Sequence, residues 1–250
     1  MKPINRILTP GLLALLLIFT DALPAQWNKK PYTEWSEKEA ARLLENSPWS
    51  QTQTFTDTSK NFSASGGSTA IADVINVNFR IRFLSARPVR QAIIRSMELQ
   101  QKGKLPDQMA AQLKAFAAAD FPDYIIITVL CDSDKASNML QQALSLLQKL
   151  KTSELKNSTY LVGGDGERLF LQEYQPPRND GLGARFVFPR VVNGKPFITP
   201  ESGEILFRSE LSGGSGLNST IPNSGSRSNG FTLNARYKVK DMMFDGRLEY

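Results

Sequence analysis

The chain has 250 residues, 41% of them hydrophobic, and its 30 basic and 24 acidic side chains give a net charge of +6 at pH 7. This is the composition of a globular protein, and so mild a positive charge does not by itself indicate a nucleic-acid partner. The sequence contains no histidine, which excludes Ser-His-Asp and Cys-His catalytic sites and zinc sites with imidazole ligands. Cys131 is the single cysteine, so no intramolecular disulfide can form.

The first 25 residues have the pattern of a secretory signal peptide. Lys2 and Arg6 precede the apolar run GLLALLLIF, and a short polar stretch closes on the small residue Ala25. The apolar run is shorter than the roughly 20 residues that cross a bilayer, so we expect cleavage, with an uncleaved anchor as the alternative. The prediction is an exported protein, periplasmic or extracellular, with residues 26–250 as a single domain and no transmembrane segment in the mature form.

A capped helix follows in the segment TEWSEKEAARLLENSPW. Ser36 and Glu39 match a capping box, and Pro48 prevents the helix from continuing. Trp35 and Trp49 lie just outside the two ends of this helix. Tryptophans can stack on sugar rings, but at these positions we expect them to anchor the helix to the body of the protein.

Two later stretches alternate strictly between apolar and polar residues, INVNFRIRF at 75–83 and FTLNARYKV at 231–239. This alternation is typical of antiparallel strands with one face on the core and the other in water. The continuous apolar run YIIITVLC at 124–131 predicts instead a strand in the centre of a sheet. It ends at Cys131, which we expect to be a buried, unreactive thiol.

Helical patterns surround the central strand. Helices are predicted to begin at Pro88 and at Pro106, the second with Met109 facing inward, and a third covers residues 136–151. Strands and turns predominate beyond this point, and the Ser-, Gly- and Asn-rich residues 212–230 predict a mobile loop. The predicted fold class is α+β: a largely antiparallel sheet with three or four helices on one face and a β-rich C-terminal half.

Basic residues gather on the polar faces of the two alternating strands, namely Arg80, Arg82, Arg236, Lys238 and Lys240. If the two strands are neighbours in one sheet, these side chains form a cationic plateau. Such a surface could bind an anionic glycan or another anionic envelope surface, because guanidinium groups pair with carboxylates and phosphates in a bidentate way. The alternative is an ordinary solvated sheet face.

Asp132 and Asp134 follow the central strand and precede a helix. Two carboxylates one residue apart can hold Mg²⁺ or Ca²⁺. The pair resembles the Asp-x-Asp of phosphotransferases of the haloacid dehalogenase type, although the Gly-Thr of that pattern is absent here. A metal-dependent hydrolase centred on this pair, with Asp165 or Glu167 as further candidate ligands, is therefore the alternative function. The other interpretation is that both aspartates are turn and helix-start residues.

Three short motifs stand out in the mature chain: W-S-x-K-E-A with the later S-P-W, then R-F-L-S-A-R-P-V-R-Q-A, and M-M-F-D-G-R-L-E-Y at the end. Together they resemble the motifs of a group of uncharacterised exported bacterial proteins. The resemblance implies a shared fold and export, and it carries no function. From the residues we expect a non-enzymatic protein that binds an anionic surface or a protein partner through a basic sheet face. The sequence predicts neither a cofactor nor nucleic-acid binding.

Overall fold

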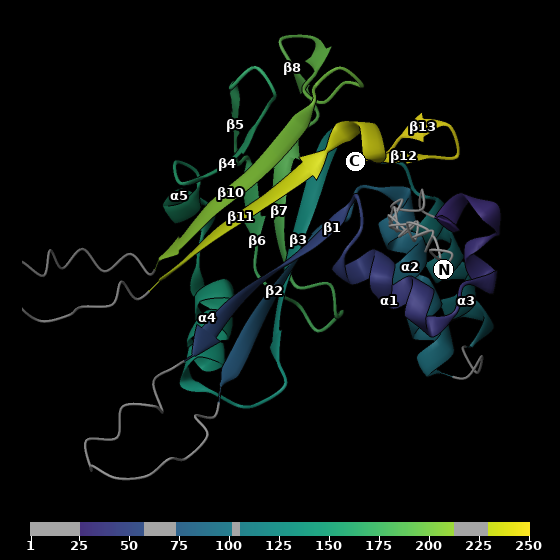
Figure 1. The fold of residues 1–250 in the computed structure, drawn as a ribbon, viewed down its shortest axis with the longest axis horizontal. Helices are drawn as coiled ribbons and strands as arrows, with labels where there is room; N and C mark the ends of the chain where they lie inside the picture. Colours follow the sequence, from purple (N-terminus) through teal and green to yellow (C-terminus); the bar gives the residue numbers. More distant parts are fainter. Residues whose placement is uncertain (1–25, 58–73, 102–105, 213–229) are drawn as a thin grey trace, which may run out of the picture.

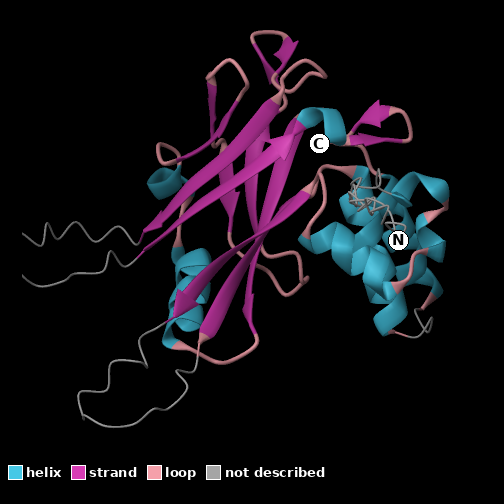
Figure 2. Ribbon diagram, in the orientation of Figure 1, coloured by secondary structure: helices cyan, strands magenta, loops and turns pink. Residues whose placement is uncertain are grey.

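The computed structural model describes residues 26–57, 74–101, 106–212 and 230–250. The predicted signal peptide and all but the two end residues of the predicted 212–230 loop lie outside this part of the chain. The described residues combine helices with antiparallel sheets (Figures 1 and 2), so the α+β class is confirmed. None of the described helices is long and apolar enough to cross a membrane.

The helices are α1 (Glu37–Glu45), α2 (Arg87–Gln100), α3 (Asp107–Ala118), α4 (Asn138–Lys149) and the single turn α5 (Thr152–Leu155). The longer strands are β1 (Ser50–Asp57), β2 (Ile75–Phe83), β3 (Tyr124–Ser133), β7 (Ala184–Pro189), β10 (Glu204–Ser212) and β11 (Gly230–Lys238). The shorter strands are β4 (Thr159–Val162), β5 (Arg168–Phe170), β6 (Glu173–Gln175), β8 (Val191–Val192), β9 (Lys195–Pro196), β12 (Met243–Phe244) and β13 (Arg247–Leu248). Short 3₁₀ turns complete the fold at η1 (Gln26–Lys29), η2 (Tyr32–Glu34) and η4 (Val239–Asp241).

The long strands divide between two sheets. One has the order β1-β2-β3-β7-β6, with the apolar strand β3 at its centre as predicted, and the other has the order β11-β10-β4-β5. In Figure 1, β10 and β11 pass in front of β7 and β3, while α1, α2 and α3 gather at one side of the sheets and α4 lies away from them. The predicted sheet is therefore two sheets, and its helices are distributed around them.

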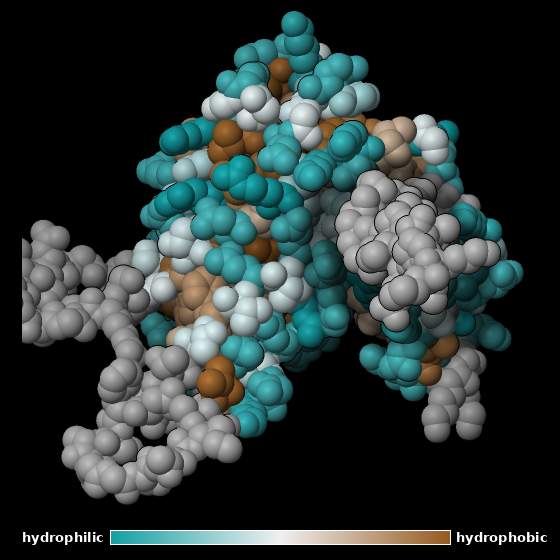
Figure 3. Space-filling model, in the orientation of Figure 1, coloured by the Kyte–Doolittle hydropathy of each residue, from teal (hydrophilic) through white to brown (hydrophobic). Residues whose placement is uncertain are grey.

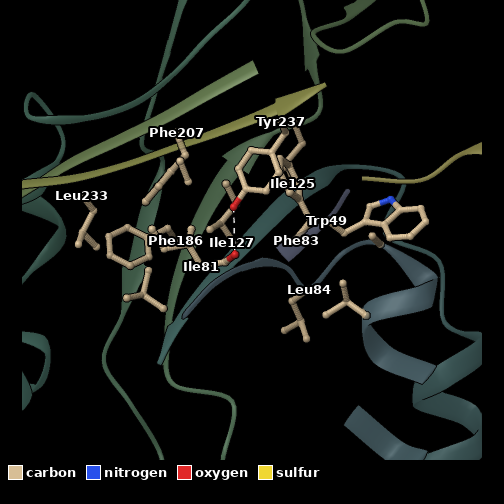
Figure 4. Close-up of a cluster of buried hydrophobic side chains, with 14 of the residues drawn as sticks. Trp49, Ile81, Phe83, Leu84, Ile125, Ile127, Phe186, Phe207, Leu233 and Tyr237 are labelled. Atoms are coloured by element: carbon tan, nitrogen blue, oxygen red, sulfur yellow. Dashed lines mark hydrogen bonds between the residues drawn. The ribbon is translucent and has the colours of Figure 1, made fainter. Parts of the chain in front are cut away.

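The apolar faces of the two sheets meet in the core. Phe83 of β2 contacts Tyr237 of β11 edge to face, with ring centroids 4.7 Å apart, and Phe186 of β7 contacts Phe207 of β10 in the same way at 5.5 Å. The Tyr237 hydroxyl donates to the Ile81 carbonyl at 3.0 Å (Figure 4). The apolar residues predicted to face the core are buried in both β2 and β11, and in β2 the outward-facing Arg82 is buried as well.

Side chains close the gap between β1 and β11, the facing edges of the two sheets. The Gln53 carboxamide donates to the Thr232 carbonyl at 2.9 Å and accepts from the Asn234 N–H at 2.7 Å. Gln51 donates to the Arg236 carbonyl in the same manner. Gln53 thus bonds β11 as a peptide group of a neighbouring strand would, while Gln51 supplies a donor only. We call this contact the β1–β11 seam.

The tryptophan-flanked helix α1 is anchored as predicted. Its capping box is present, and Trp35 and Trp49 are each only 1% exposed. The Trp49 indole N–H donates to the Glu249 carbonyl at 2.9 Å, so the last residues of the chain hold one end of the helix. The prediction that these tryptophans serve packing is confirmed.

Arg90 joins α2 to its surroundings from a buried position. This side chain is 1% exposed and donates only to backbone carbonyls: Leu84 and Ser85 before α2, and Phe116 and Ala119 at the end of α3. Arg90 therefore donates to carbonyls at the C-terminal end of α3, where helical carbonyls lack their usual partner four residues later. The prediction for Met109 was wrong: this residue of α3 is 48% exposed.

Candidate functional site

Arg80 lies on the outer face of β2 and is held by two carboxylates. Its Nη1 is 2.7 Å from Glu45 Oε1 at the end of α1, and its Nε is 2.8 Å from Asp132 Oδ2 at the end of β3. The ion pairs come from two different elements, so the guanidinium is fixed and its charge is balanced. It does not extend into solvent as the predicted plateau requires.

Arg82 occupies the next outward position of β2, but α1 covers it. The side chain is 6% exposed, and its Nε donates to the Leu44 carbonyl at 2.7 Å. Burial lowers the pKa of this arginine to about 10, with a further contribution from the charge of Arg80, and it remains charged at neutral pH. Arg82 bonds a carbonyl of the last turn of α1. Alternation alone predicted that it lies on a solvated basic face, and that prediction was wrong because α1 covers the side chain.

The other three predicted basic residues lie on or just beyond β11. Arg236 and Lys238 are exposed on the outer face of β11, and Lys240 lies past the strand in η4. β11 belongs to the four-stranded sheet and faces β1, whereas β2 lies on the far side of β1. The two basic strands are therefore not neighbours in one sheet, and the five residues do not form one plateau.

A different basic surface is formed by the outer face of the four-stranded sheet. Cross-strand pairing places Leu206 opposite Arg236 and Val162, and Arg208 opposite Asn234 and Tyr160, while Arg168 pairs with Val162. We call the cations Arg168, Arg208, Arg236 and Lys238 the outer basic face. The sequence reasoning missed Arg168 and Arg208, although the alternation in EILFRSEL could have placed Arg208 on a polar face.

Two glutamates balance part of the charge of this face. Arg208 Nη2 is 2.8 Å from Glu210 Oε1, and Arg236 Nη1 is 3.9 Å from Glu204 Oε2. Both ion pairs are exposed, and the Arg236 side chain is itself 71% exposed. Because exposed ion pairs of this kind contribute little energy, an incoming anion can compete for these arginines.

Aromatic rings lie among the cations. The Arg168 guanidinium is 4.8 Å from the centre of the Tyr160 ring, and the Tyr160 and Phe170 rings meet edge to face at 5.6 Å. Phe170 is 46% exposed. The view in Figure 3 shows hydrophobic patches between hydrophilic side chains over β10 and its neighbouring strands, so the surface is mixed in character.

The predicted metal-binding aspartates are not brought together with further carboxylates. Asp132 is engaged by Arg80, and Asp134 is exposed in the connection that leads to α4. Asp165 and Glu167 lie in the turn between β4 and β5, which Figure 1 places at the opposite end of the sheets. Across the described ranges, no three Asp, Glu, Cys or His side chains are placed so that they could hold a metal ion. The third carboxylate that the hydrolase hypothesis needs is thus missing from this part of the chain.

Cys131 is buried in β3, and burial raises the pKa of its thiol to about 12. A thiol with such a pKa is protonated at neutral pH and is a poor nucleophile. The expectation of an unreactive, buried cysteine agrees with this environment.

Comparison of the chain with protein-family models, with curated proteins and with solved structures finds no match. The resemblance to exported bacterial proteins thus stays a prediction from short motifs.

Proposed function

We propose that this chain is an exported, non-enzymatic protein that binds an anionic glycan through the outer basic face. The proposal depends on one observation above all: four cations and an exposed aromatic ring share a sheet face that no described helix covers. Export is inferred from the signal-peptide pattern of residues 1–25.

The chemistry of the face favours a glycan with carboxylate or sulfate groups. Arg236, Arg208 and Arg168 come from β11, β10 and β5, and β4 lies between the last two. Because strands in a sheet are spaced about 4.8 Å apart, these cations are spread across the width of the face. A linear polyanion can contact several of them at once. Phe170 offers an apolar ring against which a sugar can pack.

Retention on a heparin column, measured against NaCl concentration, tests the proposal, with neutral dextran as the comparison matrix. Reversing two exposed charges in the variant Arg236→Glu/Lys238→Glu should weaken heparin binding about tenfold or more at low salt, because two favourable charge contacts become repulsive. The matched control is Lys114→Glu/Lys149→Glu, which changes net charge equally at exposed helix positions.

Equal losses in the two double variants would mean that only net charge matters, and they would refute a defined site. If the unchanged protein is not retained on heparin in a salt-sensitive way, glycan binding is refuted. A protein partner would then be the alternative, because aromatic residues and arginine are enriched at protein interfaces.

A further inference from the structure

A polar groove lies elsewhere, where the C-terminal end of α1 meets the outer faces of β1 and β2. Its volume is about 460 Å³, and it is lined by Glu45, Asn46, Gln51, Thr52, Asn78 and Arg80. This volume falls within the range of roughly 300–1,000 Å³ that is typical of small-molecule sites. All six lining residues are polar, whereas most ligand pockets are mainly apolar. A ligand that fits this groove must therefore be polar over most of its surface.

The way in which α1 ends leaves one polar group of the groove unused. The last carbonyls of the helix are bonded by side chains from outside it: Leu43 by the Ser47 hydroxyl, Leu44 by Arg82 and Glu45 by the Thr52 hydroxyl, at 2.7 to 2.9 Å. The Asn46 carboxamide is consequently not required as a helix cap. Among the described residues it has no hydrogen-bond partner, so its donor and acceptor are available to a ligand.

Other lining groups also keep unused hydrogen-bonding capacity. The Asn78 Oδ1 atom accepts from the Thr54 hydroxyl at 2.8 Å, which leaves the Asn78 amide hydrogens for a ligand. Glu45 bonds Arg80 through Oε1, which leaves Oε2 as an acceptor. The groove thus offers both donors and acceptors, and those of Asn46, Asn78 and Glu45 are carried on planar groups.

The local charges favour an uncharged ligand. Arg80 and Arg82 face Glu45 and Asp132, so two positive charges balance two negative ones. An anion entering the groove meets the carboxylates, and a cation meets the guanidinium groups. A hydroxyl-rich ligand suits the groove better, because each hydroxyl both donates and accepts and because vicinal hydroxyls match planar carboxylate, amide and guanidinium groups.

We infer that this groove binds a neutral saccharide, as a site separate from the outer basic face. No aromatic ring lines it, so hydrogen bonds supply the recognition and the dissociation constant is expected in the millimolar range. Asn46, Asn78 and Glu45 contact the sugar hydroxyls.

Titration of the full protein with cellobiose and with lactose, followed by ¹⁵N–¹H correlation spectra, tests this inference. The side-chain amide signals of Asn46 and Asn78 should shift in a saturable way. The experiment is run at high salt, which suppresses binding at the outer basic face, so the two proposals fail or succeed independently.

Asn78→Leu and Asn76→Leu form a matched pair. Both asparagines lie on the outer face of β2 and accept a hydrogen bond from a threonine of β1, at 2.8 Å for Asn78 and 3.1 Å for Asn76, but only Asn78 lines the groove. Asn78→Leu should weaken sugar binding about tenfold, as expected for the loss of one hydrogen bond. Asn76→Leu should bind as the unchanged protein does.

Three results would overturn the inference: no saturable shift with either sugar at about 50 mM, equal sugar affinity in both variants, or equal shifts with inorganic phosphate. The first would show that the groove holds only water. The last would show that it recognises charge rather than hydroxyl groups.

Discussion

Replacement of Arg90 by methionine tests the reading of this buried arginine as the link between α2 and α3. Four hydrogen bonds from a charged donor, at about 1.5 kcal/mol each, stabilise the fold by about 6 kcal/mol. Burial of the charge opposes them. It lowers the pKa of Arg90 from 12.5 to about 10, which corresponds to roughly 3 kcal/mol. Arg90→Met should therefore lower the free energy of unfolding by about 3 kcal/mol.

Urea denaturation followed by circular dichroism measures this change, and a melting temperature lower by about 6–12 °C should accompany it. Arg95→Met is the control on the same helix, because Arg95 makes one carbonyl bond, to Trp35 at 2.7 Å, and an ion pair with Glu98. Its cost should be about 1.5–2 kcal/mol. If Arg90→Met costs no more than Arg95→Met, the four carbonyl bonds do not hold α2 and α3 together and the reasoning fails.

Three further predictions concern the seam, the thiol and the helix cap. Gln53→Leu removes both hydrogen bonds of that side chain across the β1–β11 seam, so amide hydrogen exchange at Asn234 should become faster and the free energy of unfolding should fall by about 1–2 kcal/mol. Iodoacetamide at pH 8 should leave Cys131 unmodified in the folded protein and modify it in urea, because burial raises the thiol pKa to about 12. Glu39 has its pKa lowered to about 2, first by the hydrogen bond from Lys30, so its contribution to stability is present above about pH 4.5 and is lost as the pH falls towards 2. Urea denaturation across this pH range should show a smaller loss of stability for Glu39→Gln than for the unchanged protein.

Each of these predictions has a clear contrary outcome. Thr54→Val is the control, because it changes the neighbouring outward residue of β1, and amide exchange at Asn234 should stay slow in that variant. If Asn234 exchanges equally fast in Gln53→Leu and in the unchanged protein, the hydrogen bonds of the seam are contradicted. Rapid modification of the folded protein would show that Cys131 is accessible. An identical pH dependence with and without the Glu39 carboxylate would show that its hydrogen bonds with Lys30 and Ser36 do not lower its pKa in solution.

The outer basic face and the groove offer different chemistry. The face presents cations whose ion pairs are exposed, whereas the groove holds its charges in balanced pairs beside free amide groups. The first should respond strongly to salt and the second hardly at all. Salt dependence is therefore the simplest way to assign any observed ligand to one of the two surfaces.

Local patterns in the sequence determined much of the secondary structure. The alternation of β2 and β11 reflects the two faces of any strand, and the Ser36–Glu39 capping box satisfies backbone groups within one turn. The central place of β3 follows from a run that is apolar on both faces. These features depend on residues close together in the chain, so the sequence alone was sufficient to predict them.

Only the tertiary structure decided which of the basic residues share a surface. Alternation put Arg82 on a polar face, but α1 packs over it, and the Leu44 carbonyl becomes its partner. Alternation equally could not show that Arg236 shares a sheet face with Arg168 and Arg208 rather than with Arg80, because strand order is set by long-range packing between residues far apart in the chain. A polar position in a strand specifies the side of the sheet on which a residue lies, and the neighbouring strands and helices determine what it meets there.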